Sequence, residues 1–503
     1  MKHSIRFLSL LLVFILVFST ALLTSCKKEM PVDEETSTDT DVEEPKTPEV
    51  NYIIKTEVKD GCIWVTYSND PENPVNVGSL GVDGAADSEG SPSYLLLPNG
   101  TYGVMAGNAK YLDKIVIAET YNGKPVSTIL ADAFNGASNL VEISIPSTIT
   151  SVGDNAFANC DKLKLTEHEN ACYLGNATNP HLVLVEAKDV TISQCVVKDG
   201  TKAICSNAFY NCTNLKSITI PDSVTSIGEK AFYNCSRISS INIPTGNTYI
   251  GPETFYECKN LETIKIPATV STIGAAAFQD CSSLKTVTIE ENSLLWGIPN
   301  AVFSGCEKLQ TINIPKSVTF IGDDKASKSG DGTFYGCKTL INVNFEEGSA
   351  LREIGRYAFD TCTSLSTLAI PSGVREIGSQ AFRNSGIQEI VIPDGVTKIQ
   401  AKTFNYCKVL KKVTFGKSIT TIESKAFEGC ALLNNVALPA SLSMIETASF
   451  SGCDALTNAS FAAPLGWYII GDEYTSIDDA TMSDPLKTAA LLTDTNTNKV
   501  IAK

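Results

Sequence analysis

Apolar residues recur along this chain with a period of about 23 residues. The clearest marker is a Phe followed three positions later by a small residue, most often Cys, as in Phe209 and Cys212. Thirteen of the 20 Phe fill this position: Phe134, Phe157, Phe209, Phe232, Phe255, Phe278, Phe303, Phe334, Phe359, Phe382, Phe404, Phe427 and Phe450. A fixed period between 20 and 50 residues indicates stacked structural repeats that share one continuous core.

A single repeat predicts its own local structure. Ile218 and Ile220 lie two residues apart, which is the spacing of a strand that turns one face inward. Pro221 ends that strand, because proline has no N–H to donate to a strand ladder. A second extended stretch runs to Ile227, and a short helical or 3₁₀ turn follows with Phe232 pointing inward. Because such a unit buries its apolar side only by stacking, the pattern predicts a solenoid of short parallel β-strands.

Breaks in the period divide the chain. The repeats occupy residues 110–462, and we expect a small β-rich N-terminal module at 51–109 and a C-terminal cap at 463–503. Residues 166–188 break the pattern and have the composition of an inserted hairpin. A second insertion, rich in Gly, Asp, Ser and Lys, occupies 323–332. Insertions in solenoids usually map to loops, often on the binding face.

The consensus of these repeats resembles a known family. The unit Ala-Phe-x-x-Cys-x-x-Leu-x-x-Ile-x-Ile-Pro-x-x-Val-x-x-Ile-Gly is similar to the BspA-type leucine-rich repeat of bacterial surface proteins. The resemblance implies a leucine-rich-repeat solenoid that presents a sheet to its partners. Some members of the family are adhesins that bind host matrix proteins or other bacteria. Such a resemblance defines a fold more firmly than it defines a ligand.

The N-terminus has the pattern of an export signal. Lys2 and Arg6 supply positive charge before an apolar stretch at residues 7–23, and charged residues follow from Lys27 onward. A single transmembrane anchor is the alternative interpretation, and the charges directly after the apolar stretch disfavour it. We expect residues 1–25 to be a lipoprotein signal peptide.

Residues 23–26, Leu-Thr-Ser-Cys, resemble the lipobox of bacterial lipoproteins, and the resemblance implies lipid attachment at Cys26. Residues 26–50 begin with this cysteine and hold nine acidic residues and no aromatic residue, which predicts a disordered acidic tether. Lys27 is not the aspartate that is linked to inner-membrane retention in some diderm bacteria. The resemblance therefore favours an exported lipoprotein of the outer membrane, placed at the cell surface.

The overall charge excludes one class of partner. The chain has 503 residues and a formal net charge of −16, whereas a nucleic-acid binder needs a basic stripe that neutralises phosphates. Outside residues 7–23, no stretch is long and apolar enough to span a bilayer. We expect no nucleic-acid partner and no small-molecule substrate, and membrane attachment only through the N-terminal lipid.

The 16 cysteines suggest disulfides at first sight, because the chain is exported. Eleven of them occupy the position after Phe, and Ala137 and Ser385 fill the same position elsewhere, so a small packing residue suffices there. We predict a ladder of reduced, buried thiols, with cross-links between coils as the minority interpretation. Evenly spaced sulfurs in a row do not make a tetrahedral metal site. Cys62 and Cys172 lie outside the ladder and are better disulfide candidates.

The sequence shows no catalytic constellation. Of the three His, His3 lies in the signal, and His168 and His181 fall in the first insertion, where solvated loop side chains are the simplest interpretation. Carboxylates are scattered, and the recurrent Gly are turn residues spaced by the repeat. We therefore predict no catalytic residue, no metal site, no cofactor and no enzyme activity.

The outward strand positions are the predicted binding face. They flank the inward residue of each strand, and 16 of these 22 positions hold Ser, Thr or Asn, with no aromatic residue and no His. The candidate binding residues are Thr263, Lys265, Thr286, Thr288, Thr311, Asn313, Asn342, Asn344, Glu389, Lys412 and Thr414. Such a surface suits many weak contacts that sum to avidity with a repetitive partner. The alternative is a Thr row that reflects β-propensity alone, without a ligand.

The sequence thus predicts a lipid-anchored cell-surface protein that mediates non-enzymatic adhesion or recognition. Its expected partners are proteins or glycans of a host matrix or of other cells. The alternative is an envelope or periplasmic scaffold without a host ligand.

Overall fold

The structure is a computed structural model that describes residues 53–59, 62–67, 70–79, 90–322, 332–470, 474–494 and 500–503. The predicted signal peptide, Cys26 and the acidic tether lie outside the described residues. Residues 323–331, which make up nearly all of the second insertion, also lie outside them.

The chain divides into two compact units, residues 1–149 with 156–163 and residues 150–155 with 164–503. The elements of the first unit are β1 (Ile53–Lys59), β2 (Cys62–Tyr67), β3 (Asp70–Ser79), β4 (Ser93–Leu96), β5 (Tyr102–Met105), η2 (Gly107–Tyr111), β6 (Lys114–Val116), β7 (Thr120–Tyr121), β8 (Lys124–Ile129) and β9 (Glu142–Ser144). β1, β2 and β3 form an antiparallel sheet. β5 pairs with β4 in antiparallel and with β8 in parallel, and β6 pairs with β9 in parallel. The first unit therefore changes to the parallel pairing that the repeats require.

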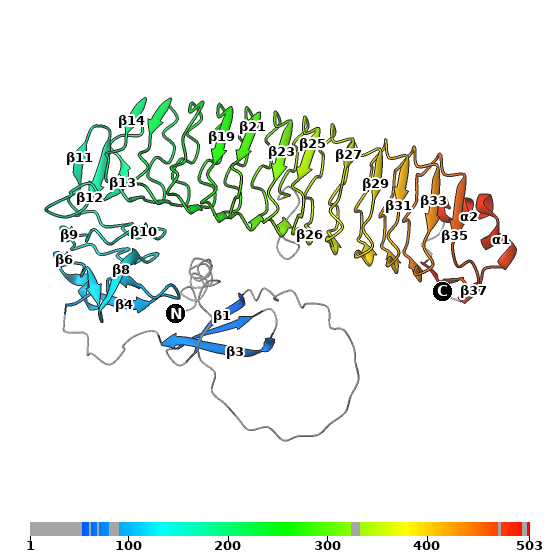
Figure 1. Cartoon of the computed structure of the whole chain (residues 1–503), viewed down its shortest axis with the longest axis horizontal. Helices are drawn as coiled ribbons and strands as arrows, with labels where there is room; N and C mark the ends of the chain where they lie inside the picture. The colour runs from blue at the N-terminus through cyan, green and yellow to red at the C-terminus, as the bar shows by residue number, and fades with distance from the viewer. Residues whose placement is uncertain are drawn as a thin grey trace, which may run out of the picture. The chain divides into compact units, whose positions relative to one another are not determined.

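The second unit is a stack of coils with two ladders of short strands (Figure 1). The first ladder carries the Ile-x-Ile motif and consists of β14 (Gln194–Val196), β16 (Ser217–Thr219), β19 (Thr263–Ile266), β21 (Thr286–Ile289), β23 (Thr311–Ile314), β25 (Asn342–Phe345), β27 (Thr367–Leu368), β29 (Glu389–Val391), β31 (Lys412–Thr414), β33 (Asn435–Leu438) and β35 (Asn458–Phe461). These strands form three parallel sheets, which run from β14 to β16, from β19 to β25 and from β27 to β35. The predicted solenoid of short parallel strands is confirmed.

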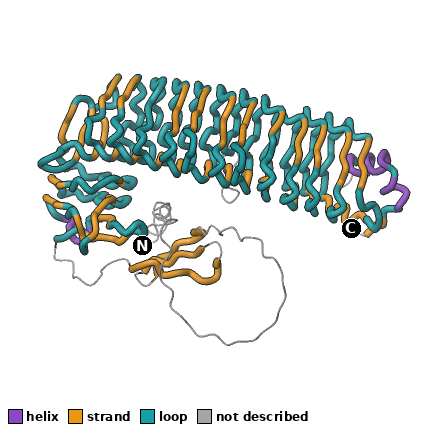
Figure 2. The backbone as a smooth tube through the Cα atoms, viewed as in Figure 1, coloured by secondary structure: helices purple, strands orange, loops and turns teal. Residues whose placement is uncertain are grey.

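The second ladder is built from two-residue strands that end at Ile (Figure 2), and six of these Ile are followed by Gly. They are β15 (Ala203–Ile204), β17 (Ser226–Ile227), β18 (Tyr249–Ile250), β20 (Thr272–Ile273), β22 (Gly297–Ile298), β24 (Phe320–Ile321), β26 (Glu353–Ile354), β28 (Glu376–Ile377), β30 (Lys398–Ile399), β32 (Thr421–Ile422) and β34 (Met444–Ile445). Another two-residue strand, β10 (Ser151–Val152), lies outside this ladder. A Cβ on Gly274 would lie 2.2 Å from the backbone nitrogen of Pro252 in the preceding coil. The recurrent Gly after these strands thus permits close approach of two coils.

A turn segment containing the recurrent Phe closes each coil. The N–H of Tyr233 donates to the carbonyl of Lys230 at 3.0 Å, whereas the N–H of Phe232 donates to the carbonyl of Thr254 in the next coil at 2.9 Å. Bonds within the coil therefore alternate with bonds between coils. Lys230 and Asn234, two residues before and two after the Phe, have φ of 56° and 53°. Because left-handed residues interrupt a right-handed helix, the expected helical turn is a series of separate hydrogen-bonded turns.

Two ladders of side chains, one of Phe and one of Cys, run through a core that also contains Ile, Leu and Val. From Phe209 to Phe450, rings of adjacent coils stack with centroids 5.1 to 5.6 Å apart. From Cys235 to Cys453, each thiol of the ladder donates to the carbonyl of the Phe one coil earlier, with S···O distances of 2.9 to 3.3 Å. The fourteen cysteines with described side chains are all free. The predicted packed thiol ladder is confirmed, and the hydrogen bond is an addition that the spacing alone did not predict.

The insertion at 166–188 forms the expected hairpin, with strands β11 (Thr166–His168), β12 (Ala171–Leu174) and β13 (Val183–Ala187). β13 pairs in antiparallel with β12 and in parallel with β15. β13 is therefore a rung of the second ladder, and this part of the insertion is not a loop. Its alternating apolar residues supply the physical reason, because Tyr173 and Leu184 belong to the shared core.

The last coil is covered by β36 (Tyr468–Ile470), β37 (Tyr474–Ser476), α1 (Asp479–Ser483), α2 (Pro485–Thr493) and β38 (Val500–Ala502). β38 pairs in antiparallel with β34, which ends the parallel ladder. Both helices pack beside β35 (Figure 1). Trp467 is buried against Phe461, with ring centroids 4.7 Å apart, so an aromatic pair closes the core.

Candidate recognition surface

The outward positions of the first strand ladder, which we call the strand face, form rows across the coils. In the sheet from β19 to β25, the register places Thr263, Thr286, Thr311 and Asn342 side by side. A parallel row pairs Lys265 with Thr288, and Asn313 with Asn344. Successive rungs of a sheet lie about 4.8 Å apart. Each row therefore presents polar groups at a short, regular spacing.

A second part of the strand face lies on the sheet from β27 to β35. Here Glu389 opposes Lys412, and Val391 opposes Thr414. All eleven candidate residues are exposed, so the structure places each of them where the sequence predicts. They fall on two hydrogen-bonded sheets, however, because no ladder joins β25 to β27 in the described residues. The sequence pattern does not reveal this break.

Two contacts already engage members of the strand face. Nζ of Lys265 lies 2.6 Å from the Glu290 carboxylate, and this hydrogen bond lowers the pKa of Glu290. The side-chain amide of Asn344 donates to the side-chain oxygen of Asn313 at 2.9 Å. Exposed pairs of this kind contribute little to stability. The strand face therefore keeps most of its hydrogen-bonding groups directed at solvent.

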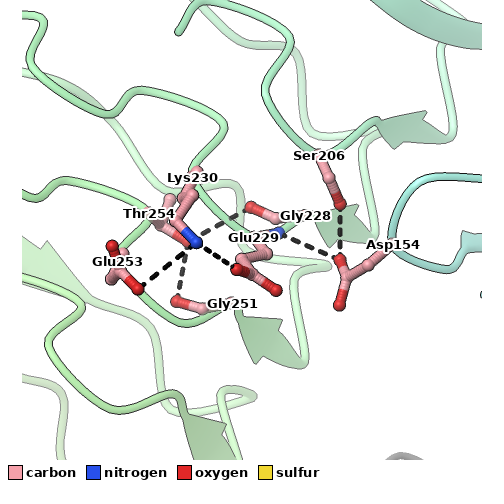
Figure 3. A network of polar contacts seen from close by, with 8 residues as sticks. All are labelled: Asp154, Ser206, Gly228, Glu229, Lys230, Gly251, Glu253 and Thr254. Atoms are coloured by element: carbon pink, nitrogen blue, oxygen red, sulfur yellow. Dashed lines mark hydrogen bonds and ion pairs between the residues drawn. The ribbon is translucent and has the colours of Figure 1, made fainter. Parts of the chain in front are cut away.

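A polar network missed by the sequence reading surrounds Asp154 (Figure 3). The hydroxyl of Ser206 donates to the Asp154 carboxylate, and the N–H of Glu229 donates to the same oxygen at 3.4 Å. Asp154, Ser206 and Glu229 each lie three residues before a recurrent Phe, and this shared position was the available signal. The three residues form one row in space, although the inserted hairpin lies between Asp154 and Ser206 in the sequence.

Lys230 compensates part of the negative charge of the three carboxylates in this network. Lys230 bonds to Glu229 at 2.6 Å and to Glu253 at 3.3 Å. Burial raises the pKa of Asp154, and the hydrogen bond from Ser206 opposes that rise. Thr254 donates its hydroxyl to the carbonyl of Gly251 at 2.7 Å within the same group (Figure 3). The ion pair of Lys230 with Glu253 and the hydrogen bond from the Glu229 N–H to Asp154 join different coils, which favours a structural role.

His168 and His181 pack against each other in the inserted hairpin. Their ring centroids are 5.2 Å apart, and the ring of Tyr173 lies 5.2 Å from His181. Burial, followed by the charges of His168 and Lys198, lowers the pKa of His181. His168 lies in strand β11, His181 lies in the turn before β13, and both are partly buried, so the interpretation as solvated loop histidines holds for His181 only in part and is wrong for His168. The strands of the hairpin bring them together.

A second buried polar group lies in the turn segments of two neighbouring coils. Asp360 is fully buried, and Nη2 and Nε of Arg383 lie 2.7 and 2.9 Å from its Oδ2. Burial raises the pKa of Asp360 more than Arg383 lowers it. The guanidinium of Arg383 also lies 5.6 Å from the ring centroid of Tyr357, a cation–π geometry. This pair was missed because its residues lie 23 positions apart on the otherwise polar turn segments.

The thiol ladder lacks the electrostatics of a nucleophile. Burial raises the pKa of Cys258 and of Cys407 to about 12. A reactive cysteine needs a lowered pKa and access to solvent. The thiols of the ladder therefore stay protonated and inert at neutral pH.

Three further features of the described residues concern metal binding, cavities and membrane spans. Within the described ranges, no three or more His, Cys, Asp and Glu side chains converge to hold a metal ion. A cavity between the last coil and the C-terminal elements, lined by Glu446, Ile469 and Leu492 among others, has room for about one water molecule. None of the helices in the described part of the chain has the length and apolar composition needed to cross a bilayer.

A parallel solenoid with a buried Phe and Cys core and a polar strand face defines a repeat protein of the leucine-rich class. Residues 108–177, 202–329 and 327–458 match the family described as the BspA type leucine rich repeat region, in six copies. The match covers more than half of the sequence, so the chain belongs to the BspA-type leucine-rich-repeat family. A comparison with curated proteins found no match.

Several solved bacterial structures are similar. A leucine-rich repeat protein from Bacteroides ovatus is 26% identical, with a TM-score of 0.42, and the alignment covers 76% of this chain and 89% of that one. A leucine rich cell surface protein from Faecalibacterium prausnitzii is 22% identical, with a TM-score of 0.28 and coverage of 76% and 96%. The pneumococcal vaccine antigen PcpA is 16% identical, with a TM-score of 0.34 and coverage of 81% of each chain.

Proposed function

We propose that this chain is an exported, lipid-anchored protein of the bacterial cell surface that recognises protein or glycan partners without catalysis. The observation that carries the proposal is the register of the strand face. Thr263, Thr286, Thr311 and Asn342 form a row of exposed hydrogen-bonding groups on adjacent strands. A repetitive partner meets such a row at many points, and weak contacts then sum to useful avidity.

Family membership supports the same proposal. BspA-type repeats resemble those of bacterial surface proteins, and solenoids present an extended surface to their partners. The acidic chain of net charge −16 fits a soluble surface module and disfavours nucleic-acid binding. The polar, shallow strand face gives no enclosed site for a substrate.

A binding experiment tests the recognition surface. Full-length protein would be applied to arrays of matrix proteins and cell-surface glycans. Replacing Thr263, Thr286, Thr311 and Asn342 together by Ala should weaken saturable binding by about tenfold or more, because multivalent contacts are lost together. Thr397, Thr420 and Ser443 are exposed beside the second ladder, and their replacement by Ala is the matched control. Absence of saturable binding by the wild-type protein would argue for a scaffold without a host ligand.

Export and anchoring need a separate test. Metabolic labelling with radioactive palmitate should label the wild-type protein, and the Cys26→Ser variant should remain unlabelled. Protease treatment of intact cells should then degrade the wild-type protein. Protection from protease, with labelling intact, would place the protein inside the envelope and contradict the cell-surface proposal.

A further inference from the structure

One coil differs from the others at the corner between its turn segment and strand β31. The position two residues after the recurrent Phe holds Asn, Asp, Glu, Gly or Thr in the other described coils, and Tyr406 here. Tyr406 has a φ of 57° and remains 46% exposed. A bulky residue in the left-handed region is strained. The repeat imposes a positive φ on this position in other coils as well, as at Thr361 with a φ of 61°, so the bulky exposed ring is what sets Tyr406 apart.

The next coil leaves room for the Tyr406 ring. Gly429 occupies the equivalent position, and a Cβ on this residue would lie 2.4 Å from Cδ1 of Tyr406. The ring therefore extends over a glycine of the neighbouring coil. This arrangement keeps Tyr406 on the surface, held against backbone, in the manner of an aromatic anchor that is ordered before it binds.

Two exposed apolar side chains lie close to Tyr406 in the repeat, one of them three residues later and the other in the next coil. Val409 and Leu432 hold the same position in adjacent coils, two residues after the ladder cysteine. They are 38% and 45% exposed. In the coils from Cys212 to Cys281 the same position holds Asn, Arg, Asn and Ser. The apolar pair is thus a local departure from a polar row, placed close to Tyr406 in the repeat.

Three lysines border the apolar pair. Lys408, Lys411 and Lys412 are exposed, and in the described part of the chain none of them forms an ion pair. Lys285 holds the position of Lys411 in an earlier coil, where it pairs with Glu262 at 3.1 Å. The earlier corner is therefore neutralised within the protein, whereas this one retains its positive charge.

The surrounding sequence strengthens the charge contrast. Residues 352–417 hold ten Lys and Arg against five Asp and Glu, in a chain whose net charge is −16. Asp360 and Arg383 compensate each other in this stretch. Glu389 opposes Lys412 across the ladder and forms no ion pair with it within 4.0 Å. A positively charged corner with an aromatic anchor complements a ligand that is both acidic and apolar.

We propose that Tyr406, Val409 and Leu432, bordered by Lys408, Lys411 and Lys412, form a docking site for an acidic protein segment with apolar side chains. The lysines select the carboxylates, and the apolar residues bury the side chains between them. A polyanionic glycan would use only the lysines and would leave the exposed ring of Tyr406 and the apolar pair uncovered. The proposal goes beyond the strand-face function, because it also applies to a scaffold that has no host ligand.

Three probes test the site on the full-length protein. The first is a synthetic peptide in which Glu alternates with Phe and Leu, the second replaces every Phe and Leu by Ser, and the third is heparin. The wild-type protein should bind the first peptide in preference to the other two. Tyr406→Asn should weaken that binding about tenfold, the effect expected for loss of an anchor residue. Replacing all three lysines by Ser should weaken it by at least as much and reduce its salt dependence.

The controls separate docking from folding. Tyr406→Asn introduces a residue that other coils carry at this position, so its unfolding temperature should equal or exceed that of the wild-type protein. Lys216→Ser changes an exposed lysine that holds the position of Lys411 in another coil, and it should leave binding unchanged. The proposal is overturned if the first peptide does not bind, if heparin or the Ser peptide binds as tightly, or if Tyr406→Asn binds normally.

Discussion

The interior and the strand face of the solenoid share one period and differ in regularity. Inside, the Phe rings repeat at 5.1 to 5.6 Å from Phe209 to Phe450. Outside, a single row changes from Thr at 263 and 286 to Glu389 and Lys412. Close packing admits few residues at an inward position, whereas an outward position accepts almost any. The interior therefore encodes the fold, and the chemistry of recognition lies where the repeat varies.

Alkaline pH should destabilise the interior most strongly. Burial raises the pKa of Cys258 and Cys407 to about 12, whereas a free thiol has a pKa of about 8.5. Above about pH 8.5 the unfolded chain ionises its thiols and the folded chain does not, so unfolding releases protons and stability falls. The stabilisation is complete below that pH and is lost as pH rises toward the folded pKa. Each buried thiol lowers the free energy of unfolding by about 1.4 kcal/mol for each pH unit in this range.

With about ten such thiols, the loss near pH 10 would exceed the typical stability of a domain, roughly 5–15 kcal/mol. Thermal unfolding in the presence of a reductant, measured from pH 7 to pH 10.5, checks this expectation. Replacing Cys258 and Cys281 by Ser should reduce the pH dependence by the share of two thiols. An unfolding temperature that stays constant up to pH 10 would contradict the burial of protonated thiols.

Shortening a buried side chain and an exposed side chain of the same coil should lower the free energy of unfolding by unequal amounts. Phe278→Ala removes a buried ring between Phe255 and Phe303 and should cost about 3–5 kcal/mol, the range for large core truncations. Thr286→Ala removes an exposed hydroxyl from the strand face and should change stability by no more than about 0.5 kcal/mol. Denaturant unfolding of both variants measures the ratio. Comparable losses would mean that the strand face is a structural part of the fold.

The interior could be predicted from the sequence, because close packing requires a fixed residue type at a fixed spacing. Sequence reasoning located the Phe and Cys positions and the outward positions of the strands. It could not find Arg383 beside Asp360, because no periodic rule links two charged side chains on separate coils. It placed His168 in a solvated loop, because the pairing of β11 with β12 depends on three-dimensional register. Features that recur in every coil could thus be predicted from the sequence, whereas contacts between coils that follow no period could not.

The buried ion pair of Asp360 and Arg383 should be an exception to the contrast between an apolar interior and a polar strand face, because it is polar and still stabilises the fold. Arg383→Met leaves the carboxylate of Asp360 buried without its cation and should cost about 3 kcal/mol at pH 7. Burial raises the pKa of Asp360 above that of the unfolded chain, so the penalty is absent below the unfolded pKa and grows as pH rises. The loss should therefore be smaller at pH 4 than at pH 7. The double variant Asp360→Asn and Arg383→Met should recover most of the stability, and equal losses at both pH values would exclude this explanation.

The ladder cysteines allow a finer distinction between volume and hydrogen bonding. Cys258→Ala removes the thiol that donates to the Phe232 carbonyl at 3.3 Å and leaves a small cavity. We expect a loss of about 1–2 kcal/mol. Cys258→Ser keeps a donor at the same position, as Ser385 does in the native chain, and should remain closer to the wild type. If Ala proves more stable than Ser in denaturant unfolding, the thiol acts through packing alone.

The turn segments lie between the two regions, because backbone geometry selects their residues. Ala276 has a φ of 57°, two residues before Phe278, where other coils use Asn155 or Asn207. Asn tolerates the left-handed region better than Ala, so Ala276→Asn should stabilise the protein by roughly 0.5–1 kcal/mol. The adjacent Ala275 is exposed and has no positive φ, so Ala275→Asn should give no gain. Equal unfolding temperatures for the two variants would show that this conformation imposes no strain on Ala276.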